Sequence, residues 1–398
     1  MVKIGIIGKP NVGKSTFFSA LTQIDVPIAS YPFTTIKANI GIGYVRKRCA
    51  HVELGVQCNP RNSLCLNGTR LLPVELIDVA GLVPGAHEGK GLGNKFLDDL
   101  RQADAFIQIV DASGTSDFEG NPCKDHDPLD DITFLQDEMN HWLAGILRDG
   151  WSRIARKLEI DHTRMDVEIE QKIAGLGISR NAINAALKNL NVEKPSEWSD
   201  EDFLKLAGDL WKLSRPMLIA ANKCDLTDPE KIKELEKSGS KAIPGLRVVP
   251  TSAEAELALV RARKAGFLDY EISGSSFSLK KELSERQAKA LDYIQKKVLD
   301  TFGSTGLQRC IEEIVLTMMD MICVYPVEDE NKFWDKDKNV LPDAYLVKKG
   351  STAKDLAYIV HTDIGDRFIR AINCRSKRVV GSDYVLEDGD VIKIVAHR

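Results

Sequence analysis

The sequence predicts an α/β fold built on a parallel β-sheet, with a helical insert and a smaller C-terminal domain. First, an apolar strand at residues 2–7 runs directly into a glycine-rich loop and then a helical stretch. Second, two more buried-strand patterns, at 216–221 and 246–250, each end in a polar motif. Third, about 100 residues separate the strand at 105–110 from the one at 216–221, which is too long for a loop.

Composition sets the limits within which these motifs are interpreted. The chain has 398 residues, which is enough for two to three domains, and its net charge of −4 excludes a polycation of the histone kind. Eight cysteines are too few for a disulfide scaffold, and no apolar run approaches the roughly 18 residues of a membrane helix. Met1 leads straight into a strand rather than a cleavable signal. We therefore expect a cytoplasmic protein that does not contact membranes.

The glycine-rich loop matches the pattern Gly, four residues, then Gly-Lys-Ser. Gly8 and Gly13 let successive backbone N–H groups point into one anion-sized hollow, and the helix N-terminus adds partial positive charge. Lys14 reaches the outer phosphates of a nucleotide, and Ser15 can ligate Mg²⁺. The predicted phosphate site comprises Gly8, Lys9, Pro10, Asn11, Val12, Gly13, Lys14, Ser15 and Thr16.

The residues that follow the two later strands favour guanine as the base. Asn222-Lys223-Cys224-Asp225 ends in a carboxylate, a pure acceptor that suits the two donors on guanine N1 and N2. Adenine lacks this donor pair. Lys223 can lie along the base, and Asn222 can brace the loop. After the second strand, the N–H of Ala253 can donate to guanine O6, and the base site is completed by Ser252, Ala253 and Glu254.

The segment between these motifs predicts a magnesium-dependent switch. A strand at 72–77 ends in Asp78, which would hold Mg²⁺ through a water, and the N–H of Gly81 would meet the γ-phosphate. Upstream, Thr35 is our choice for a further Mg²⁺ ligand, with Thr34 second. The candidate catalytic residues are Lys14, Thr35 and Gly81.

The residue after Gly81 departs from the pattern of many GTPases, which place a water-orienting glutamine there. Leu82 has no polar group for that task. His87 is the nearest candidate to replace it, and its alternative is an ordinary solvent-facing loop histidine.

Together, residues 8–16, 31–35 and 78–96 and the guanine motif resemble the Obg-related GTPases, on the YchF side and in its archaeal-type branch. The resemblance implies a P-loop NTPase (Ras-like) core, in the class where an apolar residue such as Leu82 replaces the glutamine. It also implies a potassium ion held with the help of Asn11. Bacterial and eukaryotic YchF proteins tend to lose the guanine motif and use ATP, whereas this chain keeps the motif.

The C-terminal part resembles a TGS domain, a ubiquitin-like β-grasp unit. We expect a GTPase domain at 1–115 and 212–320, a helical insert at 116–211 and the TGS domain at 321–398. Within the insert, apolar residues from Ile132 to Ile146 step by three and four, and Ser199 is typical of a helix N-cap. A faint helix-turn-helix pattern at 173–190 is interpreted as structural, so no sequence-specific DNA partner is expected.

A group of basic residues in the C-terminal domain leaves two interpretations open. RNA or ribosome binding is one, and an ordinary solvated surface is the other. The residues are Arg367, Arg370, Arg375, Lys377 and Arg378.

Three cysteines and a histidine fall in the hairpin between the switch segments. They are Cys49, His51, Cys58 and Cys65. Thiolate and imidazole suit zinc, although the spacing is not the usual Cys-x-x-Cys. A second metal site, a disulfide and plain loop residues all stay open at this point.

The sequence therefore predicts a GTP-binding protein that slowly hydrolyses GTP to GDP with Mg²⁺ and acts as a nucleotide-dependent switch. The resemblance links it to the ribosome or RNA. Two alternatives are an ATPase of YchF type and a nucleotide-gated scaffold with little turnover.

Overall fold

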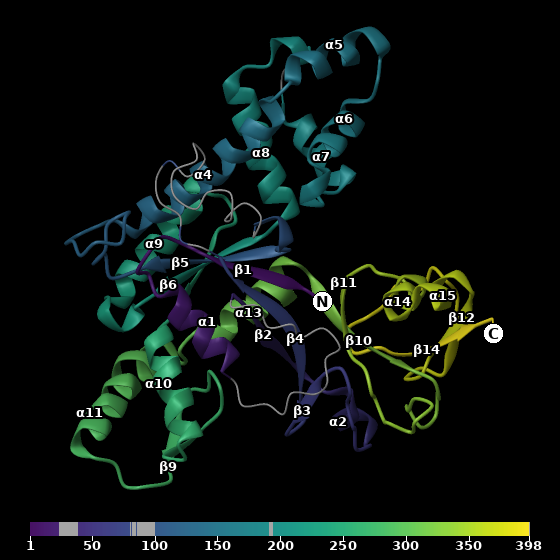
Figure 1. Ribbon diagram of the computed structural model, residues 1–398. Coiled ribbons are helices and arrows are strands. Elements are labelled where there is room, and N and C mark those ends of the chain that lie inside the picture. The colour runs from purple at the N-terminus through teal and green to yellow at the C-terminus, as the bar shows by residue number, and fades with distance from the viewer. Residues whose placement is uncertain (24–38, 80, 82–84, 86–99, 191–193, 398) are drawn as a thin grey trace. The chain divides into compact units, whose positions relative to one another are not determined.

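The computed structural model describes residues 1–23, 39–79, 81, 85, 100–190 and 194–397 (Figure 1). The chain divides into a larger unit, residues 3–23 and 76–310, and a smaller unit, residues 1–2, 24–75 and 311–398. This division differs from the expected domains, because it groups the hairpin segment before residue 76 with the C-terminal part. Each unit is described separately below.

The larger unit is built on parallel strands that pair in the order β1-β5-β6-β7. Their residues are almost all buried, as expected for a sheet covered on both faces. The last residues of β4 run beside β1, where the N–H of Val79 donates to the carbonyl of Ile6 at 3.1 Å. The carboxyl ends of these strands therefore meet at one edge, where such sheets bind ligands. The strands are β1 (Lys3–Ile7), β4 (Thr69–Asp78), β5 (Ala105–Asp111), β6 (Met217–Asn222) and β7 (Arg247–Pro250).

From the sequence, the stretch after residue 254 is expected to be helical up to about residue 320, with a break at 274–278. In the structure this break is a longer segment that contains two strands. Strands β8 (Leu268–Tyr270) and β9 (Phe277–Leu279) form a hairpin there. The hairpin covers Glu256, a fully buried carboxylate that accepts hydrogen bonds from the Tyr270 hydroxyl at 2.8 Å and the Ser273 N–H at 3.1 Å. The helices of the larger unit are α1 (Lys14–Thr22), α9 (Pro229–Ala242), α10 (Ala253–Lys264), α11 (Glu285–Ile294) and α12 (Asp300–Phe302), with a 3₁₀ turn at Cys224–Leu226 and a π-helical turn at Gln295–Leu299. Helix α13 (Leu307–Glu312) crosses the boundary between the units, and a π-helical turn at Glu313–Met318 belongs to the smaller unit.

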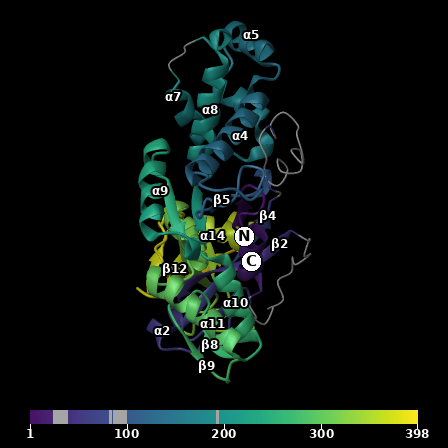
Figure 2. The same cartoon turned by 90° about the vertical axis from the view of Figure 1, so that its left-hand side faces the viewer.

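The insert between β5 and β6 is helical, as predicted, but its first helix begins only at Pro128. Residues 112–127 form a loop with a single bridge between Ser116 and Pro122. The two longest helices, α4 and α8, lie side by side in Figures 1 and 2. The N-cap expected at Ser199 is present as a capping box with Asp202. The helices are α4 (Pro128–Arg148), α5 (Trp151–Asp161), α6 (Met165–Lys172), α7 (Arg180–Lys188) and α8 (Asp200–Ser214), with 3₁₀ turns at Ala174–Leu176 and Pro195–Glu197.

Aromatic side chains join the insert to the sheet. The rings of Trp142 on α4 and Trp211 on α8 stack with centroids 6.0 Å apart, and Trp211 meets Phe106 of β5 edge-on at 6.2 Å. The indole N–H of Trp211 donates to the carbonyl of Met139 at 3.1 Å, so its polar atom is satisfied. The insert and one face of the sheet therefore share a single apolar core.

The smaller unit contains a hairpin segment and a five-stranded sheet with the order β11-β10-β14-β12-β13, against which α14 and α15 pack. Of the five basic residues, Arg370 lies on β12, Arg378 on β13, Arg375 and Lys377 in the turn between them, and Arg367 at the C-cap of α15. Residues 384–386 contribute a single bridge, between Val385 and Thr352. The elements are β2 (Ile40–Arg48), α2 (Ala50–Leu54), β3 (Leu64–Leu66), β10 (Met321–Val327), β11 (Tyr345–Lys348), α14 (Ala353–Val360), α15 (Thr362–Asp366), β12 (Phe368–Asn373), β13 (Arg378–Val380) and β14 (Val391–Ala396).

No helix among the described residues combines the length and the apolar character that crossing a membrane requires.

Candidate functional site

The glycine-rich loop takes a backbone path that only glycine permits at two positions. Gly8 has a φ of +147°, and a Cβ there would lie 2.5 Å from the carbonyl oxygen of Ile109. Gly13 has a φ of +98°, and a Cβ there would lie 2.4 Å from the Asn222 side-chain nitrogen. Gly13 also caps α1 without a side-chain bond, so the first N–H groups of that helix are available to an anion.

Lys14 lies at the centre of this loop. Its ammonium group donates to the carbonyl of Lys9 at 2.6 Å. Burial lowers the pKa of Lys14 to about 8, and nearby Asp78 acts in the opposite direction. A Cβ on Gly81 would lie 3.1 Å from the Lys14 ammonium, so the backbone of Gly81 passes directly against it. The structure thus brings together two of the three residues predicted to take part in hydrolysis.

The predicted magnesium ligands Ser15 and Asp78 also converge. The Ser15 hydroxyl donates to an Asp78 carboxylate oxygen at 3.4 Å, although the two residues are 63 positions apart in sequence. A hydroxyl and a carboxylate at this spacing are hard oxygen ligands of the kind that Mg²⁺ prefers. Four residues of the sequence argument lie outside the described part of the chain: Thr34, Thr35, Leu82 and His87.

On the base side, Asn222 connects two loops. Its side-chain N–H donates to the carbonyl of Val12 at 2.8 Å, and its oxygen accepts from the N–H of Ala253 at 3.0 Å. The second bond differs from expectation, because the Ala253 N–H was predicted to serve guanine O6. Ala253 is the first residue of α10, and the amide that accepts its N–H is buried.

Asp225 is held at the same edge by its neighbours. The Ser252 hydroxyl donates to one carboxylate oxygen at 2.8 Å, and the Tyr293 hydroxyl approaches the other at 3.4 Å. Sequence analysis missed Tyr293, which comes from α11 and lies 68 residues further along the chain. Glu254 is exposed in the first turn of α10.

Sequence analysis also missed Asp111, the last residue of β5. Its carboxylate accepts from the Lys223 ammonium at 2.6 Å and from the hydroxyls of Ser113 and Ser116 at 2.5 and 2.8 Å. Burial alone would raise the pKa of Asp111, but these hydrogen bonds outweigh it and the pKa is lowered. Lys223, predicted to lie along the base, therefore has its charged end in an ion pair. The sequence signal that could have identified Asp111 is an acidic residue at the end of a buried strand.

The loop after β5 covers the outer side of the phosphate loop. Lys9 is buried, and its ammonium donates to the carbonyl of Ser116 at 2.6 Å and lies 2.8 Å from Asp131. The side chain of Asn11 donates to the carbonyl of Gly120 at 2.9 Å. The charge of Lys9 is thus paired within the protein.

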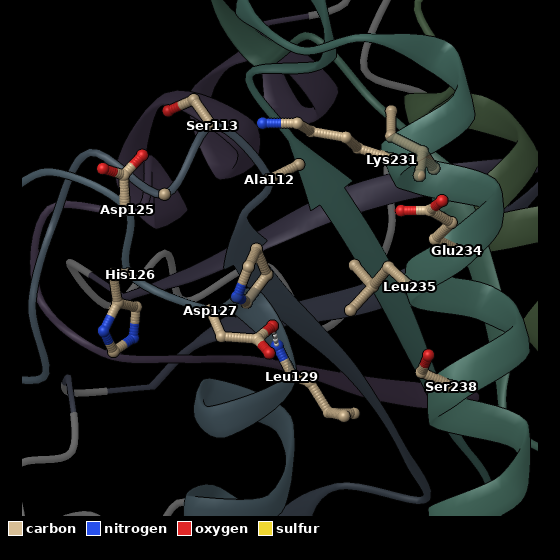
Figure 3. A pocket seen from close by; sticks show the side chains of 13 residues that line it. Ala112, Ser113, Asp125, His126, Asp127, Leu129, Lys231, Glu234, Leu235 and Ser238 are labelled. Atoms are coloured by element: carbon tan, nitrogen blue, oxygen red, sulfur yellow. Dashed lines mark hydrogen bonds between the residues drawn. The ribbon is translucent and has the colours of Figure 1, made fainter.

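A separate cavity of about 340 Å³ lies between the loop after β5 and α9 (Figure 3). Ser113 and Asp127 line one side, while Lys231, Glu234 and Leu235 of α9 line the other. It contains no residue of the phosphate or base motifs, so it is distinct from the site above.

Family models match three parts of the chain: the 50S ribosome-binding GTPase model at residues 3–144, the Obg-like GTPase YGR210-like, G4 motif-containing domain at 220–329, and the TGS domain at 338–396. An uncharacterized GTP-binding protein of Methanocaldococcus jannaschii is 52% identical over 402 residues, covering all of this chain and 99% of that protein. The chain belongs to the YchF-type, Obg-like family of GTP-binding proteins. The predicted family and the predicted fold class are confirmed.

Other members of the YchF-type family extend this picture. The crystal structure of a GTP-binding protein from Pyrococcus horikoshii is similar over all of both chains, with 41% identity and a TM-score of 0.81. A Bacillus subtilis relative named ribosome-binding ATPase YchF is 29% identical over 98% of this chain and 97% of its own length.

The low pKa of Lys14 predicts that GTP binding takes up a proton near pH 8. Phosphate groups raise the pKa of an adjacent ammonium, so the bound pKa exceeds the free value of about 8. Affinity should be full below pH 8 and decline as pH rises from about 8 towards the bound pKa. Calorimetry in buffers of different ionisation enthalpy measures this uptake. The variant Lys14→Arg, whose side chain stays charged, should show none, and equal uptake in both proteins would contradict the prediction.

Proposed function

We propose that this YchF-type protein is a Mg²⁺-dependent GTPase whose bound nucleotide, GTP or GDP, switches it between two states. One observation carries the proposal. The loop from Gly8 to Ser15, the Ser15–Asp78 pair and the Asn222–Asp225 motif all lie at the carboxyl edge of one parallel sheet. That convergence supports phosphate, metal and base recognition at a single site.

Guanine recognition rests on Asp225. Its carboxylate is oriented by Ser252, and only guanine offers two adjacent donors to such a group. The Bacillus relative is named an ATPase, which makes ATP the main competing substrate. An adenine at this edge would leave the carboxylate without matching donors, which costs binding free energy.

Slow hydrolysis follows from the lack of a glutamine after Gly81. In this proposal Ser15 and Thr35 ligate Mg²⁺, Asp78 does so through a water, and Lys14 with the Gly81 N–H stabilises charge on the γ-phosphate. Leu82 contributes no polar group to orient the attacking water. A potassium ion near Asn11 would add positive charge, and the amide oxygen of Asn11 would be its ligand.

The ribosome or its RNA is the proposed partner, which would place the protein in the cytoplasm. Two of the five basic residues of the C-terminal domain are engaged within the smaller unit: Arg375 with Glu53 at 2.7 Å, and Lys377 with the carbonyl of Glu330 at 2.6 Å. Arg370 and Arg378 lie on exposed positions of β12 and β13. These exposed cations are the proposed contacts to RNA phosphates.

The variant Asp225→Asn should shift preference from guanine to xanthine nucleotides, because the amide replaces an acceptor by a donor. We expect GTP affinity to fall by about 100-fold, in line with the cost of unmatched buried polar groups. Competition of GTP, ATP and xanthosine triphosphate against a fluorescent GDP analogue measures this. The matched control Asp228→Asn, at the N-cap of α9, should leave the order unchanged. Equal binding of GTP and ATP by the unmodified protein would favour the ATPase alternative.

Single-turnover phosphate release should be slow in sodium and faster in potassium at equal ionic strength, by about 100-fold if the ion acts as one charge-stabilising group. Omission of Mg²⁺ should abolish release. If no phosphate is released in sodium and none in potassium, the hydrolysis proposal is overturned and the scaffold alternative is favoured.

Ribosome binding should depend on the bound nucleotide. We expect co-sedimentation with ribosomes to differ between a non-hydrolysable GTP analogue and GDP, and to weaken as salt rises. The double variant Arg370→Glu/Arg378→Glu should lower it several-fold, whereas Lys349→Glu, an exposed reversal in a turn of the same unit, should not. Equal loss in both variants would exclude a specific role for the two arginines.

A further inference from the structure

Four side chains of the smaller unit that are of metal-binding types converge on one point. The ligand atoms of Cys49, His51, Cys58 and Cys65 all lie within 4.8 Å of one another. Cys49 Sγ is 4.0 Å from Cys58 Sγ, and His51 Nδ1 is 3.2 Å from Cys58 Sγ and 3.4 Å from Cys65 Sγ. Cys49 and Cys58 are buried, and the other two residues are half-buried.

These separations match the edges of a tetrahedral zinc site. With zinc bonds of about 2.3 Å to sulfur and 2.05 Å to nitrogen, tetrahedral geometry places two sulfurs about 3.8 Å apart and a sulfur and a nitrogen about 3.6 Å apart. A disulfide is the competing arrangement, and it requires sulfurs about 2.05 Å apart. All eight cysteines of the chain are unbonded to one another. The geometry therefore matches ligands around a metal rather than a cross-linked pair.

Local sequence explains how the chain brings these residues together. Asn67 and Gly68, with φ of 48° and 82°, make the two-residue turn between β3 and β4. That turn is fixed to the start of α2, because the N–H of Cys49 donates to the carbonyl of Gly68 at 2.8 Å. Helix α2 places His51 one half-turn after Cys49 and ends at Gly55 in the left-handed region. The chain then returns through Cys58 to Cys65 on β3.

A buried arginine beside the cluster supplies an independent observation. Arg70 lies opposite Cys65 in the β3–β4 pair and is fully buried. Its guanidinium donates to the Ser63 hydroxyl at 2.9 Å and the Leu341 carbonyl at 2.8 Å, and its Nε has no hydrogen-bond partner among the described residues. Its charge interacts with Cys49, Cys58 and Tyr325, and the guanidinium carbon lies 5.3 Å from the centre of the Tyr325 ring.

A buried positive charge is costly unless a negative charge compensates it. Neither the hydroxyl nor the carbonyl that Arg70 contacts is charged. Three thiolates, a neutral imidazole and one Zn²⁺ carry a net charge of −1, which balances the guanidinium. The residue types of the cluster and the charge of its buried neighbour thus point to the same ion.

We propose that Cys49, His51, Cys58 and Cys65 bind one structural zinc ion, and that Arg70 neutralises the resulting complex. Four protein ligands close the coordination sphere, so the site has no open position for catalysis. This site is independent of the nucleotide and of the proposed GTPase function.

The ion fixes the loop on which the C-terminal part of the smaller unit rests. Between Cys58 and Cys65, the N–H of Asn59 donates to the carbonyl of Val340 at 3.0 Å, and that of Arg61 to the carbonyl of Pro342 at 2.7 Å. The Arg61 guanidinium also pairs with Asp343 at 3.2 Å. Because the zinc ligands Cys58 and Cys65 flank this loop, the bound ion keeps the loop in the position that makes these contacts.

Metal analysis of the full-length protein tests the site directly. After equilibration with zinc and removal of loosely bound metal, we expect inductively coupled plasma mass spectrometry to find about one zinc ion per chain. The double variant Cys58→Ser/Cys65→Ser should lose it, whereas Cys123→Ser, whose thiol lies outside the cluster, should keep it. His51→Cys retains four soft ligands and should also keep zinc. A zinc content no higher than background in the unmodified protein would overturn the proposal. A disulfide would overturn it too, and would leave six of the eight thiols free after denaturation without reductant.

Cobalt substitution tests the site in the unmodified protein, so its result does not depend on whether a variant folds. Co²⁺ added to the metal-free protein should give the visible bands of a tetrahedral ion and thiolate charge-transfer absorption, and zinc should displace it. An octahedral cobalt spectrum would contradict the proposal. Removal of zinc by a chelator should also speed trypsin cleavage after Arg61 several-fold, because the loop then loses its anchor. An unchanged cleavage rate would overturn the anchoring role.

Discussion

The nucleotide edge depends on one buried side chain, the amide of Asn222. Its N–H holds the carbonyl of Val12 in the phosphate loop, and its oxygen holds the N–H of Ala253 at the start of α10. A buried amide whose two ends are satisfied by two different loops fixes the distance between them, because losing either bond leaves a desolvated polar group at a cost of about 1–3 kcal/mol. The same constraint explains Gly13, since any side chain there would collide with this amide. Phosphate and base recognition are thus coupled through backbone geometry.

A second level of organisation consists of buried ion pairs that connect this edge to the insert. Asp111 at the end of β5 binds Lys223 of the base motif, and Lys9 of the phosphate loop binds Asp131 on α4. Burial raises the pKa of Asp131, while Lys9 and His126 act against it. Removing one partner of such a pair costs about 3–5 kcal/mol, because the other charge stays buried. The Lys9–Asp131 pair thus joins the phosphate loop to α4, and the Trp142–Trp211 stack joins α4 to α8.

The sequence was most informative where function constrains residue type locally. The spacing of Gly8, Gly13 and Lys14, and the polar ends of the strands, were sufficient to predict the α/β class and the edge that holds the site. The helix stripe of α4 and the cap at Ser199 follow from short-range rules. Residues whose role depends on distant partners could not be assigned this way. Asp111 and Tyr293 carry no local motif, and the ion pair of Lys9 with Asp131 joins residues that are 122 positions apart in the sequence.

The buried cations of the chain show that residue type alone does not predict how a buried charge is compensated, because this depends on the groups around it. Lys9 is balanced by the Asp131 carboxylate, and Arg215 is surrounded by the carbonyl oxygens of Leu100, Ala103 and Leu176. In Arg215, burial lowers the pKa, as expected for a cation whose partners carry only partial charge. Arg70 donates hydrogen bonds to one hydroxyl and one carbonyl, and its charge also interacts with the thiols of Cys49 and Cys58. Thiols compensate a cation only when they ionise, and a bound divalent metal is what stabilises three thiolates side by side. The proposed zinc site therefore supplies negative charge that compensates buried Arg70, in the way that the Asp131 carboxylate compensates buried Lys9.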